Sequence, residues 1–138
     1  MKNRTVIIIP ARYGSSRYKG KPLVKILGRP LILRVADICV KTIGKDNLYV
    51  ATDNLKIKKV VEESSYKCVL TSNKCLTGTD RVAEAAKKIK AKIYINVQGD
   101  EPLINPKDIK KIIAAKKNFL ITLFVDTIKY INCKIQKV

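Results

Sequence analysis

The residues best suited to chemistry lie in one loop at positions 11–23, directly after the first apolar segment of the chain. This loop contains two glycines, two serines, two arginines and two lysines. Glycine lets a backbone approach a ligand closely, and amides, hydroxyls and cations together bind polyphosphates. The composition favours a phosphate site, although a solvated basic loop would look similar. It is not a Walker A loop, because five residues separate Gly14 from Gly20 and Pro22 replaces the magnesium-binding Ser or Thr.

A second segment, at positions 96–102, follows another apolar stretch and contains Gly99 and Asp100. A carboxylate at this position can hold magnesium against phosphates, because hard cations require oxygen ligands. Gly99 would let the backbone turn close to the ligand. The alternative is an ordinary turn, in which Gly-Asp is common.

A third segment, at positions 76–81, is predicted to open a helix with Thr79 as its N-cap and Arg81 in its first turn. The free amides at such a start, and the Arg81 cation, could contact a nucleotide. Helix capping alone also explains Thr79 and Asp80. Asp53 is interpreted as a turn or cap residue and not as a ligand.

Other kinds of chemistry are excluded by residue types that the chain lacks. There is no histidine, which rules out Ser-His-Asp and Cys-His nucleophiles and every histidine-ligated metal site. The four cysteines form no Cys-x-x-Cys pair and are expected to be reduced thiols without zinc; they are Cys39, Cys68, Cys75 and Cys133.

The net charge of +18 raises the question of nucleic-acid binding. The basic residues are scattered and are not interleaved with stacking aromatics, so we predict no nucleic-acid partner. No apolar run approaches the roughly 20 residues of a membrane helix, and no signal-peptide pattern follows the basic N-terminus. We therefore expect a cytoplasmic protein without membrane insertion.

Strand and helix patterns alternate along the chain. Short apolar runs predict strands, and segments with helical spacing of apolar residues lie between them. The alternation predicts an α/β fold with a mostly parallel sheet, in which ligands bind at the carboxyl ends of strands. The predicted strands are 6–9, 47–51, 67–70, 92–97 and 120–125, and the predicted helices are 30–42, 55–64, 80–90 and 106–116.

Taken together, the motifs resemble one family, the 3-deoxy-manno-octulosonate (Kdo) cytidylyltransferases. The segments that carry the resemblance fall in the family's order and spacing, and they are 8–13, 20–23, 51–53, 78–84 and 96–102. The resemblance implies a Rossmann-like three-layer sandwich of the nucleotide-diphospho-sugar transferase type, with residues 1–138 forming its nucleotide-binding domain. It also implies that Kdo attacks the α-phosphorus of CTP to give CMP-Kdo and pyrophosphate, for lipopolysaccharide biosynthesis.

The resemblance also implies roles for particular residues. Arg12, Lys21 and Asp100 would be catalytic: the two cations would neutralise the triphosphate, and Asp100 would bind Mg²⁺. The nucleotide would be bound by these two cations together with Ala11, Ser15, Ser16, Arg17, Thr79, Arg81, Gln98 and Gly99.

The chain departs from the family in two respects. Lys19 stands where the family usually has a proline, which predicts a less stiff loop. The chain also ends before the part that in the family supplies most of the sugar site, a further metal carboxylate and the contacts of a homodimer. A cytidylyltransferase for another acid sugar, and a truncated, inactive CTP-binding remnant, therefore stay open as alternatives.

Overall fold

The computed structural model describes residues 4–14, 17–114, 120–123 and 134–136. Ser15, Ser16 and Cys133 lie outside the described residues, as does the end of the fifth predicted strand. The main sheet has six strands in the order β5-β4-β1-β6-β7-β8. These strands are β1 (Thr5–Ala11), β4 (Leu48–Thr52), β5 (Lys67–Leu70), β6 (Ile93–Val97), β7 (Leu120–Leu123) and β8 (Lys134–Gln136). All neighbouring pairs are parallel except β7 and β8.

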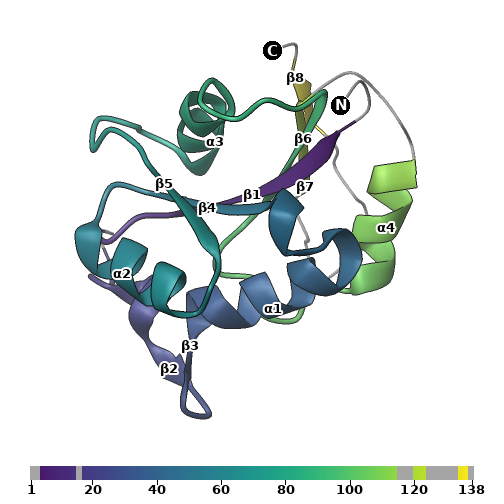
Figure 1. Ribbon diagram of the computed structural model, residues 1–138. Helices are drawn as coiled ribbons and strands as arrows, with labels where there is room; N and C mark the ends of the chain where they lie inside the picture. The colour runs from purple at the N-terminus through teal and green to yellow at the C-terminus, as the bar shows by residue number, and fades with distance from the viewer. Residues whose placement is uncertain (1–3, 15–16, 115–119, 124–133, 137–138) are drawn as a thin grey trace.

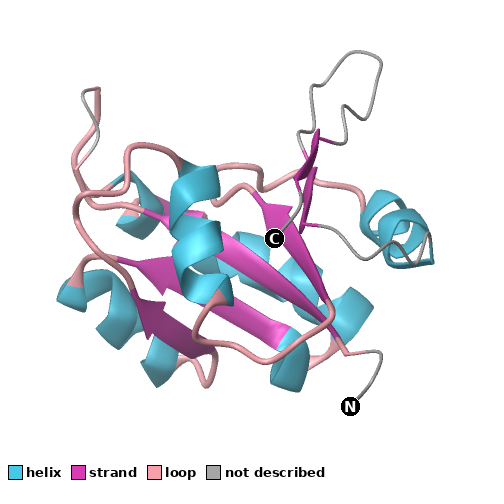
Figure 2. Ribbon diagram, turned by 90° about the horizontal axis from the view of Figure 1, so that it is seen from above, coloured by secondary structure: helices cyan, strands magenta, loops and turns pink. Residues whose placement is uncertain are grey.

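Helices cover both faces of the sheet, which gives three layers (Figure 1). One face carries α1 (Leu31–Ile43), α2 (Leu55–Glu63) and α4 (Pro106–Ala114), and the other carries α3 (Gly78–Ala86). In Figure 2, viewed from the side of α3, one helix crosses in front of the strands and others lie behind them. The expected α/β sandwich with a mostly parallel sheet is confirmed.

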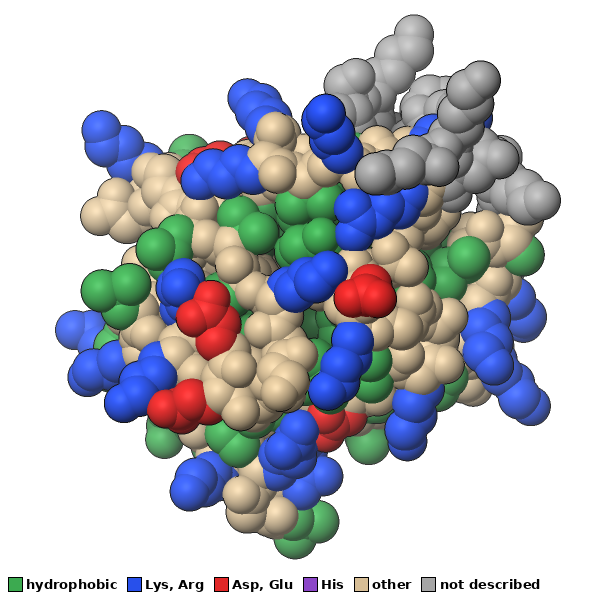
Figure 3. Space-filling model, viewed as in Figure 1, with side chains coloured by type: hydrophobic (Ala, Val, Ile, Leu, Met, Phe, Trp, Pro, Cys, Tyr) green, Lys and Arg blue, Asp and Glu red, His purple; other side chains and the backbone are tan. Residues whose placement is uncertain are grey.

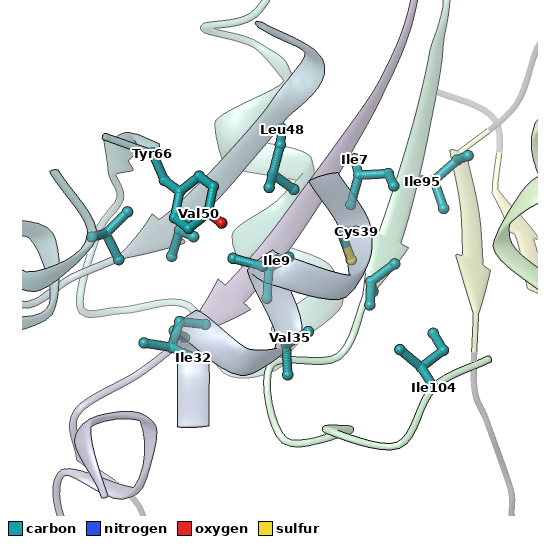
Figure 4. Close-up of a cluster of buried hydrophobic side chains, with 14 of the residues drawn as sticks. Ile7, Ile9, Ile32, Val35, Cys39, Leu48, Val50, Tyr66, Ile95 and Ile104 are labelled. Atoms are coloured by element: carbon teal, nitrogen blue, oxygen red, sulfur yellow. The ribbon is translucent and has the colours of Figure 1, made fainter. Parts of the chain in front are cut away.

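The core follows from the alternation of side chains along the central strand, β1. Ile7 and Ile9 point toward α1, where they pack with apolar residues of β4, β6 and the covering helices (Figure 4). Val6 and Ile8 point the other way and pack under α3. All four side chains are fully buried, which explains why this strand is a continuous apolar run rather than an alternating one.

The predicted strands and helices are present, with ends shifted by a few residues, but the start predicted for α3 is wrong. Thr77, not Thr79, is the N-cap, and its Oγ1 accepts a hydrogen bond from the backbone N–H of Asp80 at 3.1 Å. Asp80 Oδ2 in return accepts from the backbone N–H of Thr77 at 3.0 Å. This reciprocal capping box satisfies two backbone donors at once, which a cap at Thr79 would not do.

Five short elements were not predicted from the sequence. They are the edge strand β8 of the main sheet, the hairpin strands β2 (Lys25–Ile26) and β3 (Arg29–Pro30), and the 3₁₀ helices η1 (Lys21–Leu23) and η2 (Lys45–Asn47). The strands of the hairpin are only two residues long, too short for an alternation of apolar and polar residues to identify. The hairpin projects beyond α1 at the bottom of Figure 1.

Among the helices of the described residues, none has both the length and the apolar character needed to cross a membrane. Cys39, Cys68 and Cys75 are free thiols. Burial raises the pKa of Cys39 to about 12, so this thiol is an unreactive part of the core. In Figure 3, lysine and arginine side chains spread over the visible face instead of gathering in one patch.

Candidate functional site

A cavity of about 740 Å³ lies at the carboxyl ends of β1 and β6. These two strands are neighbours, but the chain leaves β1 toward β4 on one side and leaves β6 toward β7 on the other. Such a switch point opens a crevice between the two following loops, and ligands of open α/β sheets bind there. The lining combines loop 11–23, the loop after β6 and the start of α3.

The loop after β1 is closed on itself, and this positions Lys21. The backbone N–H of Gly20 donates to the carbonyl of Tyr13 at 2.7 Å, and Gly20 adopts a left-handed φ of 73° that favours glycine. Pro22, at the second position of the short helix η1, is buried. Lys21 is held at the first position of this helix and faces the cavity.

Lys21 and Asp100 meet across the mouth of the cavity. Lys21 Nζ lies 3.3 Å from Asp100 Oδ2, and each side chain is about half exposed. In sequence the two residues are 79 positions apart, and only the pairing of β1 with β6 brings them together. An exposed pair of this kind contributes little to stability and can exchange its partners for a ligand.

The loop after β6 approaches the backbone of β1 closely at Gly99. A Cβ added there would stand 2.7 Å from the carbonyl oxygen of Pro10 and 3.3 Å from Ile32 Cδ1. A side chain at position 99 would therefore force the loop and β1 to move apart. Gln98 and Asp100, on either side of it, line the cavity.

The start of α3 forms the opposite wall. Gly78 packs against Pro10 and Gln98, and a Cβ there would lie 3.2 Å from Pro10 Cγ. Thr77 and Gly78 line the cavity together with Cys75 and Leu76. Within segment 76–81, site roles are predicted from the sequence only for Thr79 and Arg81, because the predicted helix start lies two residues too late. Cys75 lies outside that segment and was missed.

Arg81 lines the cavity from a buried position and is held by groups of this chain. Its Nη1 donates to Thr71 Oγ1 at 2.6 Å and to the Ser72 carbonyl at 3.2 Å. Its Nη2 lies 3.7 Å from Asp53 Oδ2. The side chain is 3% exposed. Through these contacts Arg81 connects α3 to the segments after β4 and β5, and its guanidinium adds positive charge to the cavity wall.

Cys75, which lines the cavity, is hydrogen-bonded to Glu84 of α3. Cys75 Sγ donates to Glu84 Oε2 at 3.1 Å, and Glu84 Oε1 accepts from the backbone N–H of Ser72 at 2.8 Å. Burial, followed by the hydrogen bond to Glu84, raises the pKa of the Cys75 thiol. The thiol is thus held protonated, as a donor and not as a nucleophile.

Most residues predicted from the sequence meet at this cavity, and their roles there stay predictions. Its lining includes Ala11, Arg12, Arg17, Lys21, Arg81, Gln98, Gly99 and Asp100. Ser15 and Ser16 lie outside the described residues. Thr79, the second residue of α3, is not part of the lining.

The donor set can be tested against a divalent cation. Among the described residues that line the cavity, Asp100 is the one carboxylate. The described part of the chain holds no group of three or more Asp, Glu, Cys or His side chains that could form a metal cage. One carboxylate fits a cation such as Mg²⁺ that takes its other ligands from water and from substrate phosphates.

Comparison with known proteins places this arrangement in context. A family model described as cytidylyltransferase matches residues 6–129. The 3-deoxy-manno-octulosonate cytidylyltransferase of Escherichia coli is 41% identical over 116 residues, covering 84% of this chain and 47% of that protein. The 8-amino-3,8-dideoxy-manno-octulosonate cytidylyltransferase of Shewanella sp. (strain W3-18-1) is 48% identical over 111 residues, covering 78% and 45%.

A similar solved structure is CMP:2-keto-3-deoxy-manno-octonic acid synthetase complexed with CTP. It superposes with a TM-score of 0.78 at 42% identity, over 82% of this chain and 47% of that one. The chain therefore spans about half the length of the curated relatives it matches.

Proposed function

The chain belongs to the cytidylyltransferase family, and from this premise we propose that it binds CTP and activates Kdo. The observation that carries the proposal is the cavity between β1 and β6. It combines the cations Arg12, Arg17 and Lys21 with the carboxylate of Asp100. Relatives with this activity, and a similar structure that contains CTP, support the same assignment.

The proposed reaction is a nucleotidyl transfer. The anomeric hydroxyl oxygen of Kdo attacks the α-phosphorus of CTP, and the bond from that phosphorus to the β-phosphate oxygen breaks. CMP-Kdo and pyrophosphate form, and the hydroxyl proton is released. The reaction needs its two substrates held in line and the negative charge of the triphosphate neutralised.

The residues of the chain would divide these tasks. Arg12, Arg17 and Lys21 would bind the triphosphate and stabilise the charge that develops on the leaving pyrophosphate. Ala11 and Gly99 line the cavity and would lie against the bound nucleotide, and Ser15 and Ser16 would extend the same phosphate loop.

The opposite wall would hold the rest of the nucleotide. Gln98 offers a polar side chain there, and Arg81 adds charge while its hydrogen bonds fix the wall. We propose no contact for Thr79 beyond the backbone amides at the start of α3.

A divalent cation, which we propose to be Mg²⁺, would be held by Asp100 together with the phosphates of the nucleotide. Such an ion polarises the α-phosphate and neutralises charge on the triphosphate. Lys21 would leave Asp100 on ligand binding and move to a phosphate oxygen, since both groups of the ion pair are half exposed.

The choice of sugar is the second part of the proposal. Kdo is the substrate named for the Escherichia coli relative, whereas the Shewanella relative is named for an 8-amino analogue. The 8-amino sugar is therefore the second candidate. We propose CMP-Kdo synthesis in the cytoplasm for lipopolysaccharide as the biological role, with residues 1–138 as a nucleotide-binding domain and a homodimer as the expected assembly.

The test is CTP turnover by the purified chain, followed as pyrophosphate release. Kdo, its 8-amino analogue and Mg²⁺ are supplied together with CTP and then omitted in turn. Release that requires a sugar and the metal supports the proposal, and the better sugar decides between the candidates. CTP binding without release would indicate a CTP-binding remnant, and a chain that does not bind CTP would contradict the proposal.

A further inference from the structure

Asn96 is a buried polar residue in an otherwise hydrophobic strand. It lies near the carboxyl end of β6, where Ile93, Tyr94, Ile95 and Val97 are also buried. The Asn96 side chain is fully buried, and its Nδ2 has no hydrogen-bond partner among the described residues.

This arrangement is unfavourable for the fold. A buried amide nitrogen without a partner loses its hydrogen bonds to water and gains none in return. Asparagine is also among the residues that strands disfavour. Neither the packing nor the strand therefore accounts for an amide at position 96.

The contact that Asn96 does make leads to the cavity. Its Oδ1 accepts a hydrogen bond from Gln98 Nε2 at 3.4 Å. Asn96 lies on the α3 face of the sheet with Tyr94, because residues two apart in a strand share a face. Gln98 follows the end of β6. Gln98 Oε1 is directed toward the start of α3, 3.4 Å from the position that a Cβ on Gly78 would occupy.

We propose that Asn96 is a positioning residue that fixes the amide of Gln98 for ligand binding. With Nε2 held by Asn96, Gln98 Oε1 is presented to the cavity as a hydrogen-bond acceptor. It would accept from an N–H or O–H of the ligand, which the cytosine amine, a ribose hydroxyl or a hydroxyl of the acid sugar can supply. This inference rests on the proposed function of the same cavity.

The experiment is a double-mutant cycle read by calorimetry. Asn96→Leu, Gln98→Leu and the double variant are compared with the parent chain for binding of CTP, and then for binding of Kdo in the presence of CTP. Leucine matches the number and branching of the heavy atoms of asparagine. Asn96→Ala is measured beside it, in case the larger methyl groups disturb the fold.

We expect Asn96→Leu and Gln98→Leu each to weaken binding of one ligand by about five- to tenfold, as loss of one hydrogen bond predicts. In the Gln98→Leu background, Asn96→Leu should have no further effect, because Asn96 acts only through Gln98. The Tm should not fall in Asn96→Leu, since an unsatisfied buried amide is removed. Weaker binding without lower stability is a combination that a purely structural role would not produce.

Thr52→Val is the matched control. Thr52 is also fully buried at the carboxyl end of a strand, and its Oγ1 accepts from the backbone N–H of Asn54 at 3.2 Å. It does not line the cavity, so the valine variant should lose stability and keep both affinities.

The outcomes separate this inference from the function it rests on. A parent chain that binds neither ligand contradicts the proposed function. A parent that binds, with Asn96 variants that bind equally well or with losses that add to those of Gln98→Leu, overturns the role of Asn96 alone. If the non-additive loss of affinity appears in the titration with CTP, Gln98 contacts the nucleotide. If it appears in the titration with Kdo, Gln98 contacts the sugar.

Discussion

At the scale of single residues, the site depends on charges that the sequence separates widely. Lys21 and Asp100 approach to 3.3 Å at the cavity mouth while both stay half exposed. A pair of this kind contributes at most about 1 kcal/mol to folding. Its value in the proposed function lies in two charges of opposite sign, placed where a nucleotide and its cation would need them.

Lys21→Ala should weaken CTP binding by tenfold or more, because a charge-assisted hydrogen bond to phosphate contributes about 1.5–3 kcal/mol. The free energy of unfolding should hardly change. Calorimetric titration with CTP and urea unfolding measure the two quantities. Lys25→Ala, an exposed lysine on β2 outside the cavity lining, is the control, and unchanged CTP affinity in Lys21→Ala would reject the phosphate role.

Gly99→Ala should destabilise the fold by about 1–3 kcal/mol, as overpacking usually does. The added methyl group would stand 2.7 Å from the carbonyl oxygen of Pro10, so β1 and the loop after β6 would have to separate. Urea unfolding measures the loss. Gly14→Ala is the matched control, because a Cβ there has no neighbour within 4 Å, and equal stabilities of the two variants would contradict the close approach.

At the scale of elements, helix starts and loop ends position the side chains of the site. The start of α3 supplies one wall of the cavity, and its capping box fixes where that wall begins. Arg81, one turn further on, connects the helix to the ends of β4 and β5.

Thr77→Ala should therefore destabilise the protein by about 1 kcal/mol, the usual contribution of an N-cap. Thr79→Ala should have a much smaller effect, because this residue lies inside the helix. Thermal and urea unfolding of both variants distinguish the two positions. A larger loss of stability in Thr79→Ala than in Thr77→Ala would indicate that Thr79 is the N-cap, as the sequence pattern predicted.

A second connection between elements predicts a dependence of stability on pH. Asp37 of α1 accepts hydrogen bonds from Arg29 of β3, at 2.5 and 2.7 Å, and from Tyr66 Oη at 2.6 Å. Burial by itself raises the pKa of Asp37, but the hydrogen bonds from Arg29 and Tyr66 together outweigh it, and the pKa lies below its ordinary value. The folded state thus favours the ionised carboxylate.

Asp37→Asn should lower stability at neutral pH by about 1 kcal/mol, a value reduced for the partial exposure of the pair. The carboxylate stabilises the fold above the pKa of an unfolded aspartate, and this contribution is lost as pH falls through the lower pKa of the folded state. Urea unfolding between pH 7 and pH 2 should show the difference between parent and variant shrinking with acid. A difference that stays constant would contradict the shift.

At the scale of the whole molecule, the described residues form one sandwich around β1, with the cavity at the carboxyl ends of its central strands. The sheet order β5-β4-β1-β6 places the loops after β1 and β6 side by side. The chain also carries a net charge of +18, which attracts anionic ligands in general. Selective binding of CTP therefore has to be distinguished from charge attraction.

CTP should raise the Tm of the chain, since a ligand at 100 times its Kd stabilises the native state by about 2.7 kcal/mol. The shift should persist in 0.3 M salt, and inorganic triphosphate at the same concentration should give a smaller one. Differential scanning calorimetry with and without each ligand measures it. Equal shifts for CTP and triphosphate would mean that the cavity recognises phosphate charge alone.

The local composition of the chain determined its secondary structure and the identity of most candidate residues. Largely apolar segments such as 6–9 and 92–97 suit strands buried on both faces, and glycines and charged residues after them mark loops suited to phosphate. The lack of histidine excludes whole classes of mechanism by composition alone. These conclusions are possible because periodicity and residue chemistry are local properties.

Tertiary structure alone decided how these residues meet. The Lys21–Asp100 ion pair and the contacts of Asp53 and Thr71 with Arg81 depend on strand order and on packing. The cap at Thr77 was missed although the sequence carries a signal for it: Asp80 stands three residues after Thr77, as in a capping box, whereas Val82 stands three residues after Thr79. Contacts between distant segments follow from the pairing of strands, which no local pattern in the sequence encodes.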